Sequence, residues 1–206
     1  DCGHVERCPH CEVSLTFHQR HELLVCHQCG HLENQRETCD ACASHRIRHL
    51  GLGTQQVEEA TQAAFPDARV ARMDADTTTR KGSHGEILQA FRDHEIDVLV
   101  GTQMIAKGLD FPNVTLVGVI LADTTLYLPD FRAAERSFNL LTQVAGRSGR
   151  SARGGEVVFQ TYQPDHYSIV AASNHDYDSF SEQELVHREE HDFPPYLRAV
   201  RLLLRG

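Results

Sequence analysis

All seven cysteines of this 206-residue chain lie within its first 42 residues. Six of them form three C-x-x-C pairs, which are Cys8 and Cys11, Cys26 and Cys29, and Cys39 and Cys42. The seventh, Cys2, has no neighbour at that spacing, although a glycine follows it as one follows Cys29. Residues 1–46 are also poor in aliphatic side chains. A segment this small needs a cross-link in addition to its apolar contacts in order to fold.

The spacing of the pairs favours two nested zinc sites. Zinc takes four thiolate or imidazole ligands, and each C-x-x-C turn presents two. The fourteen residues between Cys11 and Cys26 are enough for a hairpin that joins two pairs, whereas the five between Cys2 and Cys8 are too few for two pairs to face one ion. We therefore expect one Zn²⁺ on the set Cys8, Cys11, Cys26 and Cys29, and a second on Cys2, Cys39 and Cys42.

The second site has three cysteines, so its fourth ligand is open. We expect a cysteine two residues before Asp1, which would make Cys2 the end of a fourth pair, and His4, His10 or His31 are the alternatives. Disulfides, free thiols and a catalytic zinc with an open position are also compatible with the residues. No glutamate adjoins Cys2, Cys39 or Cys42 as a general base would, so a structural role is favoured.

From Ile47 onward, strand-like and helix-like stretches alternate. Helices are predicted at 53–65, with Thr54 as its cap, at 83–94, at 130–146 and within 166–191. Strands are predicted at 68–74, 97–102, 114–123 and 155–162. Because these strands are apolar on both faces, they favour a parallel sheet covered by helices, which is an α/β fold. We expect a cysteine-rich module over 1–46, an α/β lobe over 47–192, and a strand within 193–206 that begins a further domain.

The stretch GTQMIAKGLDFPNVTLV (101–117) joins two predicted strands. Ligands bind at the carboxyl ends of strands in open parallel sheets. Glycines at 101 and 108 would let the backbone approach such a ligand, and Lys107 and Asp110 would offer a charge and an acceptor for a ribose hydroxyl. Thr102 and Gln103 would supply hydrogen bonds. An ordinary glycine-containing connection is the alternative.

A second stretch, QVAGRSGR (143–150), ends the predicted helix that begins near Asp130. Arg147 and Arg150 are three residues apart, so their side chains can point the same way. Paired guanidinium groups suit the oxygens of a γ-phosphate and stabilise charge during phosphoryl transfer. Taken alone, the stretch could be an exposed basic turn.

Together these stretches resemble the second RecA-like lobe of superfamily 2 helicases, with GTQMIAKGLDFP as motif V and QVAGRSGR as motif VI. A cysteine module that runs into GLGTQQVEE, RMDADTTTRKG and LADTTLYLPDFRAAER is similar to the replication-restart DNA helicases of that superfamily. The resemblance covers nearly the whole chain, as far as DFPPY. It implies a RecA-like lobe with a two-zinc module at its N-terminus.

The resemblance also implies an activity and partners. The implied activity is that of an ATP-dependent 3′→5′ DNA helicase that restarts replication. The implied partners are forked and single-stranded DNA, primosome proteins and single-stranded-DNA-binding protein. Gln143, Arg147 and Arg150 would face the ATP γ-phosphate across the cleft to a first helicase lobe. Asp110, Gly108 and Lys107 would lie at the nucleotide, and Thr102 and Gln103 toward DNA. Asp74, Asp76, Arg80 and Lys81 belong to a shared stretch without an assigned role beyond a capped turn.

Several expected features are missing from the sequence. It contains no G-x-x-x-x-G-K-[ST] loop and no D-E-x-H box, so we expect Mg²⁺ and ATP to be bound by a first lobe and this chain alone to be inactive. The net charge of −9 gives no sign of DNA binding. Neither an apolar run of about 20 residues nor a signal peptide occurs, so a cytoplasmic location is expected. A zinc-dependent docking module, or another superfamily 2 translocase with a zinc insertion, is the alternative.

Overall fold

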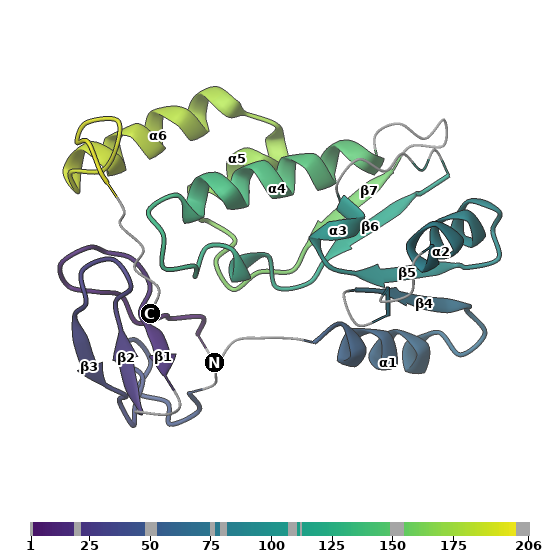
Figure 1. Cartoon of the computed structure of the whole chain (residues 1–206), viewed down its shortest axis with the longest axis horizontal. Coiled ribbons are helices and arrows are strands. Elements are labelled where there is room, and N and C mark those ends of the chain that lie inside the picture. The colour runs from purple at the N-terminus through teal and green to yellow at the C-terminus, as the bar shows by residue number, and fades with distance from the viewer. Residues whose placement is uncertain are drawn as a thin grey trace. The chain divides into compact units, whose positions relative to one another are not determined.

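The computed structural model describes residues 2–18, 22–47, 53–74, 77–78, 82–106, 111, 113–148 and 155–200. The chain divides into two compact units, the first made of residues 1–49, 120–142 and 160–206, and the second of residues 50–119 and 143–159. Figure 1 shows the elements of both units. Helix α4 (Ala133–Ser148) begins in the first unit and ends in the second.

The cysteine-rich segment contains three short antiparallel strands, in the order β1 (Thr16–His18), β2 (Leu23–Val25) and β3 (Leu32–Asn34) (Figure 1). The expected hairpin is confirmed, because Thr16 pairs with Val25 in the register of β1 and β2. Each strand is only three residues long, too short to show a period in the sequence. A small core of Cys8, Val13, Leu15, Leu24 and Cys26 also includes Phe193.

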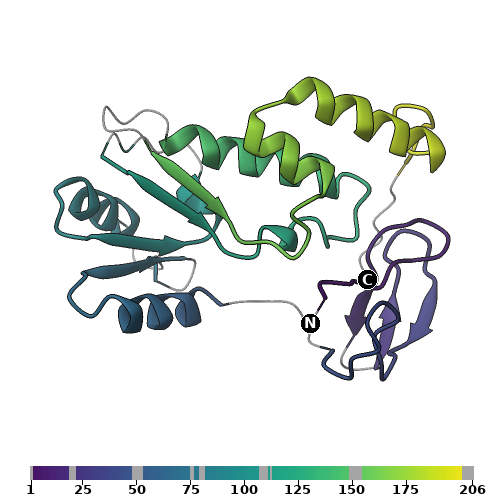
Figure 2. The same ribbon diagram turned by 180° about the vertical axis from the view of Figure 1, so that it is seen from behind.

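The second unit contains two pairs of parallel strands. Strands β4 (Val70–Met73) and β5 (Val98–Gly101) form one pair, and β6 (Leu116–Val119) and β7 (Glu156–Phe159) form the other. Figure 2 shows β6 and β7 side by side. Parallel pairing is confirmed, whereas the described residues form two two-stranded sheets instead of one. The prediction that β6 is apolar and covered on both faces is wrong, because Leu116 is 61% exposed.

The helices lie close to their predicted positions. They are α1 (Thr54–Ala64), α2 (Ser83–Arg92), α4, α5 (Tyr167–Asn174) and α6 (Tyr177–Glu190), with a 3-10 turn at Ala122–Thr124. Thr54 is not the cap of α1, because Gly53 holds that position and the Thr54 hydroxyl donates to Asp74 instead. The region after β5 contains a short helix, α3 (Gln103–Ala106), where a loop was expected.

The predicted helical region 166–191 is two helices instead of one. His175 adopts a left-handed conformation with φ of 54°, which ends α5. The Asp176 side chain then accepts a hydrogen bond from the Ser179 N–H and caps α6. The strand predicted within 193–206 is absent from residues 193–200, and residues 201–206 lie outside the described part. No helix among the described residues is long and apolar enough to cross a membrane.

Helices of the first unit are joined by stacked rings and a partly buried ion-pair network. Phe138 of α4 stacks on Phe180 of α6, with ring centroids 4.2 Å apart. Arg188 of α6 donates to Glu135 of α4 at 2.5 Å and to Glu184 at 2.8 Å. Because Arg188 and Glu184 lose most of their water there, their pairing and the contact of Arg188 with the more exposed Glu135 fix how α4 and α6 pack.

Candidate functional site

The three complete C-x-x-C pairs share one backbone geometry. In each, the N–H of the first cysteine donates to the carbonyl five residues on, and the N–H four residues on donates back to that cysteine's carbonyl. These bonds measure 2.8 and 3.0 Å at Cys8, 2.8 and 2.9 Å at Cys26, and 2.9 and 2.8 Å at Cys39. Such a turn directs both thiols of a pair to the same side, as a tetrahedral metal requires.

The residue after the second cysteine is left-handed in all three pairs. Its φ is 54° at Glu12, 79° at Gly30 and 55° at Ala43. A left-handed residue with a side chain costs roughly 1–2 kcal/mol. Two of the three turns therefore carry strain that the surrounding interactions have to offset, and a bound metal would do so.

The thiols of four cysteines converge as the nested prediction requires. The Sγ atoms of Cys8, Cys11, Cys26 and Cys29 lie within 4.8 Å of one another, and those of Cys8 and Cys29 are 3.6 Å apart. Four thiolates around zinc would stand about 3.8 Å apart at the usual zinc–sulfur bond length. All seven cysteines are unbridged. The set fits a zinc ion in size and in chemistry.

The backbone around these thiols favours thiolates at some positions and burial opposes them at others. The His31 N–H lowers the pKa of Cys29 to about 7. The N–H groups of Cys42 and Ala41 lower the pKa of Cys39. Burial raises the pKa of Cys11. A coordinated metal removes the proton from a thiol outright, whether the pKa of that thiol is raised or lowered without the metal. The raised and lowered pKa values are therefore both consistent with cysteines that bind a metal cation as thiolates.

The second group consists of Cys2, Cys39 and Cys42, whose Sγ atoms also lie within 4.8 Å of one another. Gly3 follows Cys2 with a φ of 75°, the same left-handed conformation that follows each complete pair. A Cβ on Gly3 would stand 2.4 Å from the Tyr162 Cβ, so glycine is required there. In the described part of the chain, none of the histidines proposed as a fourth ligand, His4, His10 and His31, joins this group.

The predicted DNA-facing residues lie at the carboxyl end of β5. Thr102 follows the last residue of that strand, and Gln103 begins α3; both are exposed. Gly101 has a different role from the one predicted: a Cβ there would stand 2.6 Å from the Met73 carbonyl oxygen, so its close approach is to β4 instead of to a ligand.

The predicted nucleotide-facing residues are only partly described. Gln143 is exposed on α4, and Arg147 lies in the same helix one turn later. The side chain of Arg147, and all of Lys107, Gly108, Asp110 and Arg150, lie outside the described residues. The structure therefore leaves the predicted phosphate contacts as a hypothesis.

Asp74, which had no assigned role, caps the turn after β4. Its carboxylate accepts hydrogen bonds from the Thr77 N–H at 2.9 Å and from the Arg72 guanidinium at 2.8 Å. The Thr54 hydroxyl bond, the Thr77 N–H and the nearby Arg72 charge hold the pKa of Asp74 at about 2. Asp76, Arg80 and Lys81 lie outside the described residues.

A buried carboxylate, Asp123, was missed from the sequence. It is fully buried and accepts hydrogen bonds from the Thr161 hydroxyl at 2.7 Å and the Tyr162 N–H at 3.0 Å. Nearby, the Tyr127 hydroxyl donates to the Gly3 carbonyl at 3.2 Å, and burial and the Asp123 charge raise the pKa of Tyr127 to about 12. The sequence signal was an aspartate directly after an apolar strand, in LAD (121–123).

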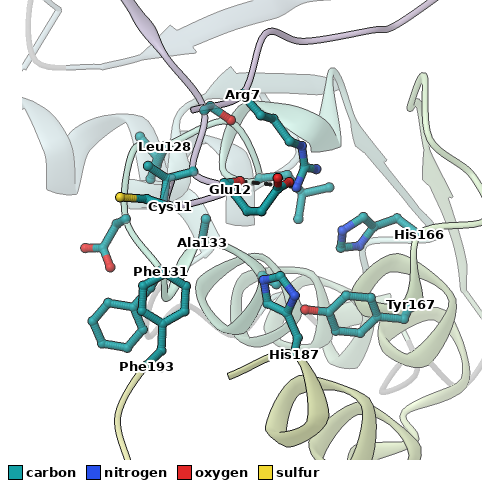
Figure 3. A pocket seen from close by; sticks show the side chains of 15 residues that line it. Arg7, Cys11, Glu12, Leu128, Phe131, Ala133, His166, Tyr167, His187 and Phe193 are labelled. Carbon is teal, nitrogen blue, oxygen red and sulfur yellow. Dashed lines mark hydrogen bonds between the residues drawn. The ribbon is translucent and has the colours of Figure 1, made fainter. Parts of the chain in front are cut away.

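A cavity of about 180 Å³ lies within the first unit (Figure 3). Arg7, Tyr167 and two histidines, His166 and His187, line it. Burial, with the nearby Arg7 charge, lowers the pKa of His166 to about 4. The ring is therefore neutral near pH 7, and its Nδ1 accepts a hydrogen bond from the Ser168 N–H in the first turn of α5. This histidine was missed because its role depends on burial.

The parallel strand pairs and the helices of this chain agree with the family whose sequence model it matches. A family described as helicase conserved C-terminal domain matches residues 20–152, so the chain belongs to that family.

Within this class, the chain is similar to replication restart protein PriA from several bacteria. It is 57% identical to that of Bacillus subtilis over 196 residues, 47% to that of Synechocystis over 209 and 48% to that of Treponema pallidum over 205. These matches cover 95%, 100% and 100% of the chain, but only 24%, 25% and 31% of the respective relatives. The resemblance to replication-restart helicases is confirmed.

Proposed function

We propose that this chain forms part of an ATP-dependent 3′→5′ DNA helicase that acts on forked DNA and restarts replication with primosome proteins. The observation that carries the proposal is the 57% identity, over 95% of the chain, to a protein named for replication restart. Two further relatives of that name match over 100% of the chain, a range that includes the cysteine pairs and both motif stretches. Single-stranded DNA and single-stranded-DNA-binding protein are further partners under this proposal.

In the proposed mechanism, the chain supplies one side of a nucleotide site and the first helicase lobe supplies the other. Arg147 and Arg150 stabilise the charge that develops on the γ-phosphate, and Gln143 lies beside them. Mg²⁺ and ATP are held mainly by the first lobe. Lys107, Gly108 and Asp110 contact the nucleotide from this side, and Thr102 and Gln103 contact DNA at the end of β5.

Both cysteine groups bind zinc in this proposal, in a structural role. The donor sets support it: four converging thiols in one group, three in the other, and backbone N–H groups directed at the sulfurs of Cys29 and Cys39. When bound, each ion would cross-link the loops that carry its cysteines. The left-handed Gly3 supports Cys2 as the end of a fourth pair, with one further cysteine as the missing ligand.

The arginine-finger role is tested by Arg150→Ala in the full-length protein. We expect fork-stimulated ATPase activity to fall by about 10³-fold, because such arginines act on the transition state. Arg132→Ala is the matched control, since that arginine is exposed and pairs with Asp130 on the surface. Wild-type ATPase activity in Arg150→Ala would show that the assigned role is wrong.

A second candidate function is docking of DNA or primosome proteins by the cysteine module. The observation that favours it is the exposure of the residues inside each C-x-x-C pair, such as His10, Gln28 and Asp40. Substituting these three with serine should weaken fork or primosome binding and leave DNA-independent ATPase activity unchanged. Unaltered binding of forks and primosome proteins would exclude this role.

A further inference from the structure

The last turn of helix α6 contains a group of potential metal ligands away from the cysteines. His187, Glu190 and His191 are at positions i, i+3 and i+4 of the sequence HREEH, so all three lie on one face of the helix. One ligand atom from each lies within 4.8 Å of the others. This group is separate from both cysteine groups and has no part in the proposed nucleotide or DNA contacts.

A hydrogen bond fixes the tautomer of one histidine. The His191 Nδ1 lies 2.9 Å from the His187 carbonyl oxygen. A carbonyl can only accept, so Nδ1 carries the proton and Nε2 holds a free lone pair. Histidines that bind metals commonly donate their second N–H to a carbonyl in this way, because the bond orients the ring. His191 is thus already set as an Nε2 ligand.

The other two side chains are available for a metal. The rings of His187 and His191 lie with their centroids 4.4 Å apart, and His187 lines the cavity of Figure 3. Over the described ranges, the Glu190 carboxylate has no hydrogen bond or ion pair and is exposed. The neighbouring carboxylate of Glu184 is different, because Arg188 and Tyr167 already satisfy it.

We propose that His187, Glu190 and His191 bind a divalent cation of the zinc and nickel class. Two imidazole nitrogens and one carboxylate oxygen are the donors these borderline ions accept, whereas calcium and magnesium prefer oxygen alone. Small changes in side-chain rotamers would bring the three ligand atoms to within about 2.1 Å of one ion. Water would fill the remaining positions.

The position of this site suggests what the metal would do. The helix ends at Glu190, and Phe193, three residues later, packs in the core that contains Cys8 and Cys26. A metal held at i, i+3 and i+4 closes the final helical turn and opposes its fraying. The cation would therefore stabilise the α6 end from which Phe193 reaches the cysteine core.

The test is titration of Ni²⁺ into the full-length protein, with its cysteine sites filled with zinc and without a polyhistidine tag. We expect one nickel ion to bind in the wild-type protein beyond those that bind the variant His187→Gln/His191→Gln. Single His191→Gln should weaken that site at least about tenfold, and Glu190→Gln should weaken it less. Glu189→Gln is the matched control and should bind like wild type.

Two further measurements distinguish other outcomes. Zinc content is followed during the titration: nickel uptake matched by zinc release would place the nickel in the cysteine sites and overturn the proposal. Hydrogen exchange at the α6 amides of each variant checks that this helix is folded, and Glu190→Gln, on an exposed side chain, provides a variant that folding defects do not affect. Equal nickel binding by wild type and His191→Gln would also overturn it.

Discussion

Among the described residues, the first of the two compact units buries more polar and more apolar side chains than the second. Among the described residues, the first unit buries the polar side chains of Ser14, Asp123, Ser137, Ser168 and Glu184, whereas the second buries Asp74. The first unit also contains all seven cysteines and most of the buried apolar side chains, whereas the second contributes Met73, Leu88, Val100 and Val144.

The difference shows two ways of specifying a structure. In the first unit, loops and helices are held by directional groups: the cysteine thiols, Arg188 between Glu135 and Glu184, and the Asp123 carboxylate that accepts from Thr161 and Tyr162. In the second unit, parallel strands are fixed by backbone pairing and close approach, as where Gly101 meets Met73. Removing a single directional partner should therefore cost more in the first unit than removing an apolar contact would in the second.

Metal removal should separate the two units most strongly. Structural zinc contributes roughly 10–16 kcal/mol of apparent binding free energy in small domains. We expect a chelator to abolish amide protection at Leu24 and Val25 of β2 while protection at Val100 of β5 persists, as read by hydrogen exchange. If the chelator removed amide protection from β2 and β5 alike, the metal would not stabilise the cysteine module selectively.

The ion-pair network of the first unit should show the next largest effect. Arg188 is only 13% exposed in its side chain, and Arg188→Ala leaves the buried Glu184 charge without its cation. We expect the free energy of unfolding, measured in urea, to fall by about 3 kcal/mol. Arg132→Ala is the control, since Arg132 also lies over the Phe131 ring but is exposed, and it should cost less than about 1 kcal/mol. If the two variants lost equal amounts of unfolding free energy, the Arg188 ion pairs would contribute no more to stability than an exposed pair does.

The close approach of strands β4 and β5 in the second unit is tested by substituting two glycines, Gly101 of β5 and Gly118 of β6. A Cβ at position 101 would stand 2.6 Å from the Met73 carbonyl, whereas nothing lies within 4 Å of one at position 118. Gly101→Ala should lower the free energy of unfolding by about 2 kcal/mol. Gly118→Ala should leave it unchanged or slightly raised. Thermal unfolding monitored by circular dichroism measures both, and a harmless Gly101→Ala would contradict the close packing of β4 and β5.

The smallest expected effect concerns pH and His166. The folded pKa of His166, about 4, is below the unfolded value near 6.5, so the unfolded state binds the proton more tightly. Stability from this group is complete above about pH 6.5 and is lost as pH falls toward 4. His166→Asn keeps an acceptor for the Ser168 N–H but cannot titrate. Between pH 7 and 5.5, wild type should lose about 1 kcal/mol more than His166→Asn, and identical pH profiles would contradict the shift.

The sequence predicted the features that depend on local pattern. The C-x-x-C spacing predicted how the thiols converge, because the loop lengths left few pairings. Apolar periodicity predicted helices α1 and α2 and the four strands of the second unit, but not the short helix α3. These are short-range signals, so they were available without knowledge of the fold.

Other features depend on partners distant in sequence and could not be predicted. Asp123 is polar at the end of an apolar stretch, and only Thr161 and Tyr162 explain its burial. The Arg188 network joins residues 53 positions apart. Thr54 fits a helix cap, yet tertiary contact directs its hydroxyl to Asp74. Strands of three residues are too short for any periodicity to reveal them.

The most direct test of the account is the number and environment of metal ions in the full-length protein. Native mass spectrometry should find two zinc ions held by cysteine thiolates, one lost with Cys26→Ser and the other with Cys39→Ser. A single ion that both variants lose, or a disulfide between any of the seven cysteines in the protein as isolated under reducing conditions, would contradict the nested arrangement.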